Sequence, residues 1–146
     1  MRQAKTYLFY ITQEGIIERK EFPSYGKALI EVDNEIIKVL TPARFLFEEG
    51  YSSREWHLDI EYQVGNILQV RLDRLDSKYW KRIKYSVRTL SPNEIRELIE
   101  KHKLYEEGYV PERFHGIQIM REEWDSNGEY DKHETLILAI ELTKMI

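Results

Sequence analysis

The sequence predicts a mainly β, α+β protein. We expect a strongly twisted antiparallel sheet of about eight strands, forming a barrel or half-barrel, with one helix near 92–103 packed against it. Three observations predict this class. Short aromatic and β-branched segments alternate between apolar and polar residues, turn residues separate them at hairpin spacing, and one segment carries clear helix start and stop signals. An open sheet with helices on one face is the alternative.

The composition is typical of a globular protein, with 42% apolar and 33% charged residues in a chain of 146. This length fits a single domain, 1–146. The absence of cysteine excludes disulfides, thiolate metal sites and a cysteine nucleophile. No apolar run is long enough for a signal peptide or a membrane span. We therefore expect a soluble protein of the cytoplasm, of a virion or of an infected cell, with no membrane partner.

The N-terminal segments 5–12 and 16–22 are rich in aromatic and β-branched residues and predict a hairpin. A three-residue loop, 13–15, would join them and end in a glycine, which accepts the left-handed backbone conformation.

The next stretch predicts a second hairpin, in which 29–32 and 35–40 flank Asp33-Asn34. A short helix, 41–49, would follow, because a Thr-Pro pair suits its first turn and a glycine follows its last residue.

The segment 55–64 has the clearest alternation in the chain and predicts a strand. Its apolar face would carry Trp56, Leu58, Ile60, Tyr62 and Val64.

We interpret 67–90 as extended as well. An odd-length loop after the strand would bring the apolar faces together and pair Ile60 with Leu72, at the cost of Asp59 opposite Asp73. A helix is the alternative, because apolar residues also recur at spacings of three and four: Leu68, Leu72, Leu75, Tyr79, Ile83 and Val87.

The C-terminal third predicts a helix, a loop and a hairpin. Ser91 and Glu94 form a capping box around a proline at the first helical position, which predicts the helix 92–103. A loop over 105–114 would follow. Then a two-residue Asn-Gly turn would join the strands 116–124 and 129–142.

Charge is distributed unevenly along the chain. Residues 67–90 have 7 basic and 2 acidic side chains, whereas 91–146 have 7 basic and 13 acidic ones. On an extended chain the cations of this basic segment share a face with an aromatic residue, which suits phosphates and stacked bases. A solvated outer strand, or a patch neutralised by the protein's own acids, is the alternative. The candidate ligand-binding residues are Arg71, Trp80, Arg82, Lys84 and Arg88.

His57, Asp59 and Glu61 are the weak catalytic candidates. They alternate along one strand and so project from one face, where neighbours could share a metal or act as a general acid and base. The alternative is a plain polar outer face. His133, predicted to lie opposite Glu122, reads as a surface pair.

Other acidic pairs, such as Glu106-Glu107, are assigned no chemistry, because loop glutamates are usually just solvated. The sequence has no P-loop, GxGxxG, HExxH or GxSxG motif.

We therefore expect a binding or interaction module that recognises an anionic ligand or partner: a nucleotide, a nucleic acid or an acidic protein surface. We expect no cofactor and no metal. A small metal-dependent or acid/base hydrolase or nucleotide-processing enzyme is the alternative. A homo-oligomer, formed by docking of basic on acidic surfaces, is a third interpretation.

Overall fold

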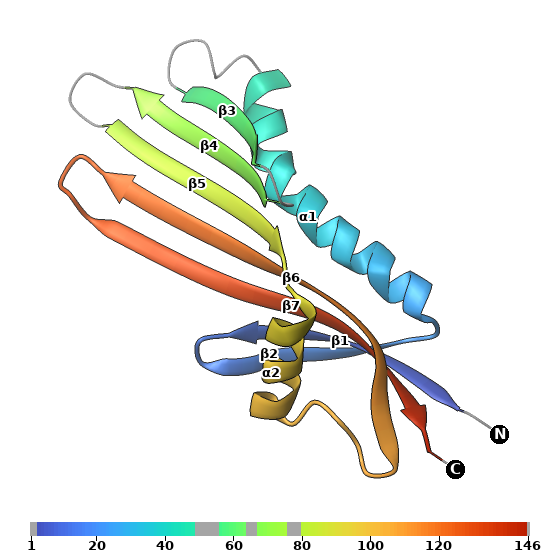
Figure 1. Cartoon of the computed structure of the whole chain (residues 1–146). Coiled ribbons are helices and arrows are strands. Elements are labelled where there is room, and N and C mark those ends of the chain that lie inside the picture. The colour runs from blue at the N-terminus through green and yellow to red at the C-terminus, as the bar shows by residue number, and fades with distance from the viewer. Residues whose placement is uncertain (1–2, 49–55, 64–66, 76–79, 146) are drawn as a thin grey trace. The chain divides into compact units, whose positions relative to one another are not determined.

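The computed structural model describes residues 3–48, 56–63, 67–75 and 80–145, with side chains described for 3–39 and 82–145. The described chain is mainly β, with antiparallel strands and two helices, as predicted (Figure 1). The elements are β1 (Ala4–Thr12), β2 (Gly15–Phe22), α1 (Tyr25–Glu48), β3 (Trp56–Gln63), β4 (Ile67–Leu75), β5 (Trp80–Thr89), α2 (Pro92–His102), β6 (Tyr109–Asp125) and β7 (Tyr130–Lys144).

The described strands follow the order β2-β1-β7-β6-β5-β4-β3. This order has two ends, so the sheet is not closed. A barrel and an eighth strand are therefore not confirmed in the described part of the chain.

The chain divides into two compact units. The first comprises 1–33, 89–118 and 135–146, and the second comprises 34–88 and 119–134. Helix α1 and strands β6 and β7 contribute residues to both units. The single domain expected from the length stays a prediction.

The first unit is built around β1, which is hydrogen-bonded to β2 on one side and β7 on the other. Six consecutive residues of β1, from Thr6 to Ile11, are buried, so both faces of this inner strand are covered. Its alternate residues pack against α2 and β7. This core comprises Tyr7, Phe9, Ile11, Leu90, Ile95, Ile99, Leu104, Leu138, Ile140 and Leu142.

The β1–β2 hairpin is confirmed, but its loop is not the predicted one. Thr12 pairs with Gly15, so the loop has two residues, and the register shifts between Tyr10 and Ile11. Tyr10 pairs with Glu18 and Ile11 with Ile16. The extra residue on β2 is thus a β-bulge within the strand rather than a third loop residue.

The hairpin predicted for 29–40 is wrong, because this stretch lies inside α1, and the helix predicted from 41 is the second part of the same helix. Ser24 begins it: its Oγ accepts a hydrogen bond from the Lys27 N–H at 3.2 Å. Ala28, Val32 and Val39 are buried at helical spacing.

The strand interpretation of 67–90 is confirmed, because this stretch forms two strands, β4 and β5. Residues 76–79 lie outside the described residues. The odd-length connection between β3 and β4 is confirmed as well, since Gln63 pairs with Ile67. The partners differ from prediction by two residues: Leu72 pairs with Leu58. This register avoids placing Asp59 opposite Asp73.

The turn between β6 and β7 is longer than predicted. The Asp125 N–H donates to the Glu129 carbonyl at 3.1 Å, which leaves three residues in the loop. Gly128 has φ +79°, the left-handed conformation that closes such a loop. Asp125 Oδ1 accepts from the N–H groups of Asn127 and Glu129, both at 2.9 Å. The carboxylate therefore favours this turn over the two-residue Asn-Gly one.

Candidate functional site

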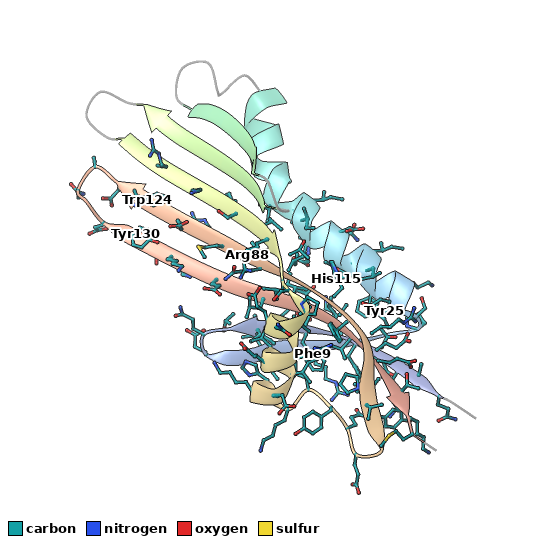
Figure 2. All side chains as sticks on the ribbon, viewed as in Figure 1. Phe9, Tyr25, Arg88, His115, Trp124 and Tyr130 are labelled. Carbon is teal, nitrogen blue, oxygen red and sulfur yellow. The ribbon has the colours of Figure 1, made fainter. Side chains whose placement is uncertain are left out.

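The predicted basic face lies within the second unit. Alternation along β5 places Trp80, Arg82, Lys84 and Arg88 on one side of the strand. Arg82 is exposed, and Lys84 and Arg88 (Figure 2) are partly exposed. The register of β4 and β5 sets Arg71 directly opposite Lys84. We call the positions Arg71, Trp80, Arg82, Lys84 and Arg88 the basic face.

The same register places the weak catalytic candidates on this side of the sheet. Asp59, Arg71 and Lys84 form one row across β3, β4 and β5. His57, Asp73 and Arg82 form the next row. Each row therefore contains one acidic position, and the first row also sets two basic positions, Arg71 and Lys84, next to each other. The side chains of His57, Asp59 and Glu61 lie outside the described set, which contains no group of three metal-ligating residues.

The pair of His133 with Glu122 that was predicted for the last hairpin does not form. His133 Nε2 lies 3.0 Å from Asp131 Oδ2, whereas Glu122 Oε2 accepts a hydrogen bond from the Tyr130 hydroxyl at 2.8 Å. Tyr130 also packs on Trp124, with ring centroids 5.2 Å apart at the hairpin tip (Figure 2). The three-residue turn explains this, because it shifts the two strands by one residue relative to the prediction.

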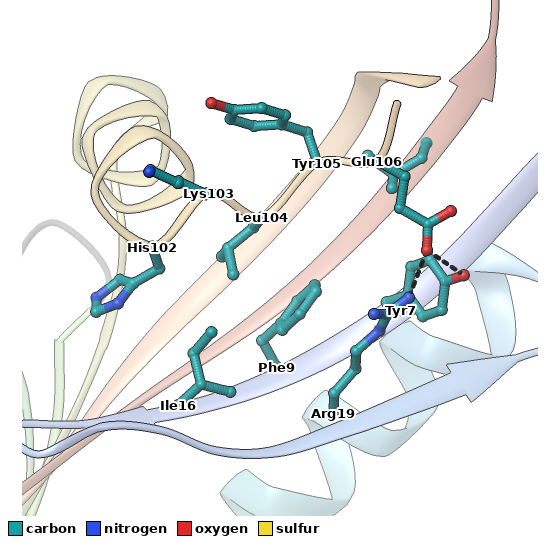
Figure 3. Close-up of a pocket in the computed structure, with 10 residues that line it drawn as sticks. Tyr7, Phe9, Ile16, Arg19, His102, Lys103, Leu104, Tyr105 and Glu106 are labelled. Atoms are coloured by element: carbon teal, nitrogen blue, oxygen red, sulfur yellow. Dashed lines mark hydrogen bonds and ion pairs between the residues drawn. The ribbon is translucent and has the colours of Figure 1, made fainter. Parts of the chain in front are cut away.

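The first unit contains a pocket that sequence reasoning missed. It has a volume of about 170 Å³ and lies between the β1–β2 hairpin and the segment that follows α2 (Figure 3). Most of its wall is apolar, with Arg19 and Glu106 at one side and Lys103 at the other (Figure 3). The lining residues are Tyr7, Phe9, Ile16, Arg19, His102, Lys103, Leu104, Tyr105, Glu106 and Leu142.

The carboxylate of Glu106 organises the polar side of the pocket. Its Oε1 accepts from Arg19 Nη2 at 2.6 Å and from the Tyr7 hydroxyl at 3.0 Å (Figure 3). Its Oε2 accepts from Lys5 Nζ at 3.1 Å. Hydrogen bonds from Arg19 and Lys5 lower the pKa of Glu106 below its usual range. Burial raises the pKa of Tyr7, and the bond to Glu106 adds to this.

The guanidinium of Arg19 is fixed in two directions. Besides its ion pair with Glu106, its central carbon lies 3.9 Å from the centroid of the Tyr7 ring. A guanidinium held over an aromatic face keeps its plane, and its five N–H donors exceed what one carboxylate oxygen can use. Arg19 is therefore held in a fixed orientation beside the pocket, and it has N–H donors beyond the one that bonds to Glu106.

The end of α2 places Glu106 beside the hairpin. Lys103 adopts φ 53° and ψ 51°, which ends the helix, and the Leu104 N–H then bonds to the Ile99 carbonyl at 3.0 Å. Leu104 is buried, so the chain turns back onto the core. The Tyr109 N–H closes the following turn on the Glu106 carbonyl at 3.0 Å. This local geometry aims the Glu106 side chain at β1 and β2.

Comparisons with protein families, with curated proteins and with solved structures found no match. Within the described residues, neither helix is long and apolar enough to cross a membrane.

Proposed function

We propose that this protein is a non-enzymatic binding module that recognises an anionic ligand or partner through the basic face. One observation carries the proposal: Arg71 and Lys84 are paired residues on adjacent strands, with Arg82 two residues further along β5. Like charges directly opposite each other on a sheet destabilise it. A bound anion lying across the two strands would offset that repulsion.

The row that contains Arg71 and Lys84 ends in Asp59 on β3, so positive charge is most concentrated toward β5. An elongated polyanion that runs along β5 would meet Arg82, Lys84 and Arg88 in turn. The Trp80 position belongs to the same alternating set of β5, and a tryptophan there suits stacking on a base. These positions favour single-stranded nucleic acid over an acidic protein.

The test uses two matched double variants of one hairpin. Arg71→Gln with Lys84→Gln removes the paired cations of the basic face. Arg74→Gln with Lys81→Gln removes a paired set of cations whose alternating positions on β5 continue with uncharged residues, Ile83, Tyr85 and Val87, so no row of cations continues from it. Binding of a labelled single-stranded oligonucleotide is measured by fluorescence anisotropy at several salt concentrations, with an acidic peptide in parallel.

We expect the first variant to weaken oligonucleotide binding and to reduce the salt slope by about 1.4, at about 0.7 per lost phosphate contact. The control variant should bind like the original protein. Equal losses in both variants, or no salt-dependent binding by the original protein, would overturn the proposal. Tighter binding of the peptide would reassign the partner to an acidic protein.

The second candidate is a small metal-dependent or acid/base hydrolase that uses His57, Asp59 and Glu61. The position of Asp59 beside Arg71 favours it, because a cation next to a carboxylate suits an anionic substrate. Metal analysis of the purified protein, combined with melting curves with and without chelator, tests the metal version. It predicts a bound metal and a lower melting temperature in chelator.

A further inference from the structure

The pocket of the first unit has the size of one six-membered ring. Cavities of about 150 Å³ lined by Leu, Ile and Phe bind benzene, and this one measures about 170 Å³. Phe9, Leu104 and Leu142 are buried residues of the core and form its inner wall. Ile16 is 43% exposed and stands at the opening (Figure 3). An aromatic ring with a short substituent therefore fits this volume.

The charges at the polar side favour an anion. Lys5 and Arg19 share the single carboxylate of Glu106, which leaves a net positive charge in this cluster. Lys103 is a further cation of the lining, on the α2 side of the pocket (Figure 3). Arg19 presents planar donors, which match the two oxygens of a carboxylate. An amine of the same size would instead be repelled by the positive charges of Arg19 and Lys103.

We propose that this pocket binds a small monocyclic aromatic carboxylate, with its ring against Phe9 and Leu104 and its carboxylate on Arg19. The site shares no residue with the basic face: all of its residues belong to the first unit, and all of the basic face belongs to the second. For a ligand of about ten heavy atoms, we expect a Kd of about 10 µM to 1 mM.

The experiment titrates the full chain with phenylacetate and follows backbone amide shifts by NMR. Three comparison compounds each remove one feature: acetate lacks the ring, benzyl alcohol lacks the charge and phenethylamine reverses it. We expect saturable shifts at Phe9, Leu104 and Glu106 with phenylacetate, and at least tenfold weaker binding of the other three. Equal affinity for acetate, tighter binding of phenethylamine, or no saturation by 10 mM phenylacetate would overturn the proposal.

Two variants and a matched control test the residue assignment. Arg19→Gln should weaken phenylacetate at least tenfold, whereas Lys20→Gln should not, because Lys20 is the next residue of β2 and does not line the pocket. Ile16→Trp should block the opening with Arg19 intact. Unchanged binding by both pocket variants would contradict the assignment. Arg71→Gln with Lys84→Gln should leave phenylacetate binding unchanged, so the two proposals fail independently.

Discussion

At the scale of a residue, Gly116 of β6 shows how closely α2 packs on the sheet. A Cβ at this position would lie 2.6 Å from Leu138 Cδ2, 3.0 Å from Leu90 Cδ1 and 3.3 Å from Ile95 Cγ1. Leu138 is fully buried and cannot move aside without disturbing its neighbours. Glycine is therefore required here by close packing rather than by backbone conformation.

We predict that Gly116→Ala lowers the free energy of unfolding by about 1–3 kcal/mol through overpacking. Gly26→Ala is the control, because a Cβ on Gly26, in the first turn of α1, has no atom within 4 Å. The control should be neutral or stabilising by up to about 1 kcal/mol. Denaturant unfolding of both variants measures these changes. An unchanged free energy of unfolding in Gly116→Ala would show that the side chains around Gly116 can move to accommodate the added methyl group.

At the scale of an element, α2 is specified by its own residues. Ser91 Oγ accepts from the Glu94 N–H at 3.2 Å, and Glu94 Oε1 accepts from the Ser91 N–H at 3.1 Å. These partners are three residues apart, so the sequence alone predicted the helix. The end of the helix is less favourable, because Lys103 holds a left-handed conformation that suits glycine.

We predict that Lys103→Gly stabilises the protein by up to about 1 kcal/mol by relieving this conformation. Lys101→Gly, within the last turn of α2, should instead destabilise it by about 1 kcal/mol. The two variants remove the same charge from neighbouring positions, so thermal melting separates the backbone effect from the charge effect. A loss of stability in Lys103→Gly would contradict the prediction.

At the scale of the whole molecule, Glu106 joins segments that are far apart in the sequence. It lies 101 residues from Lys5 and 87 from Arg19, yet it bonds to both. Its lowered pKa means that these contacts stabilise the fold above the unfolded pKa of about 4.5. That stabilisation is lost as the pH falls through the lower pKa of the folded state.

We predict that Glu106→Gln is less stable than the original protein at neutral pH and that the difference disappears under acid conditions. The effect should be small, because these groups are partly exposed and water screens them. Glu107→Gln, at the exposed next position, is the control. Urea unfolding between pH 7 and pH 2 measures the difference, and a constant gap across that range would contradict the assignment.

Local residue patterns were enough to predict several elements: the capped helix α2, the alternating strand β3, the extended pair β4 and β5, and the existence of the β1–β2 and β6–β7 hairpins. The odd number of residues between β3 and β4 was predicted as well, because only a loop of odd length brings the apolar faces of the two strands to the same side. These features depend on residues a few positions apart. Alternation alone also predicted that Trp80, Arg82, Lys84 and Arg88 occupy alternate positions of one extended segment, which is β5.

The remaining features depend on contacts between segments that are distant in the sequence. Asp33-Asn34 reads as a turn until the burial of Val32 and Val39 favours a continuous helix. The pairing of Arg71 with Lys84, and the rows they form with β3, depend on register, which a single bulge or loop residue changes. The pocket brings Tyr7, Arg19 and Glu106 together from distant segments. Contacts of such long sequence separation leave no local pattern, because they form only when the whole core packs.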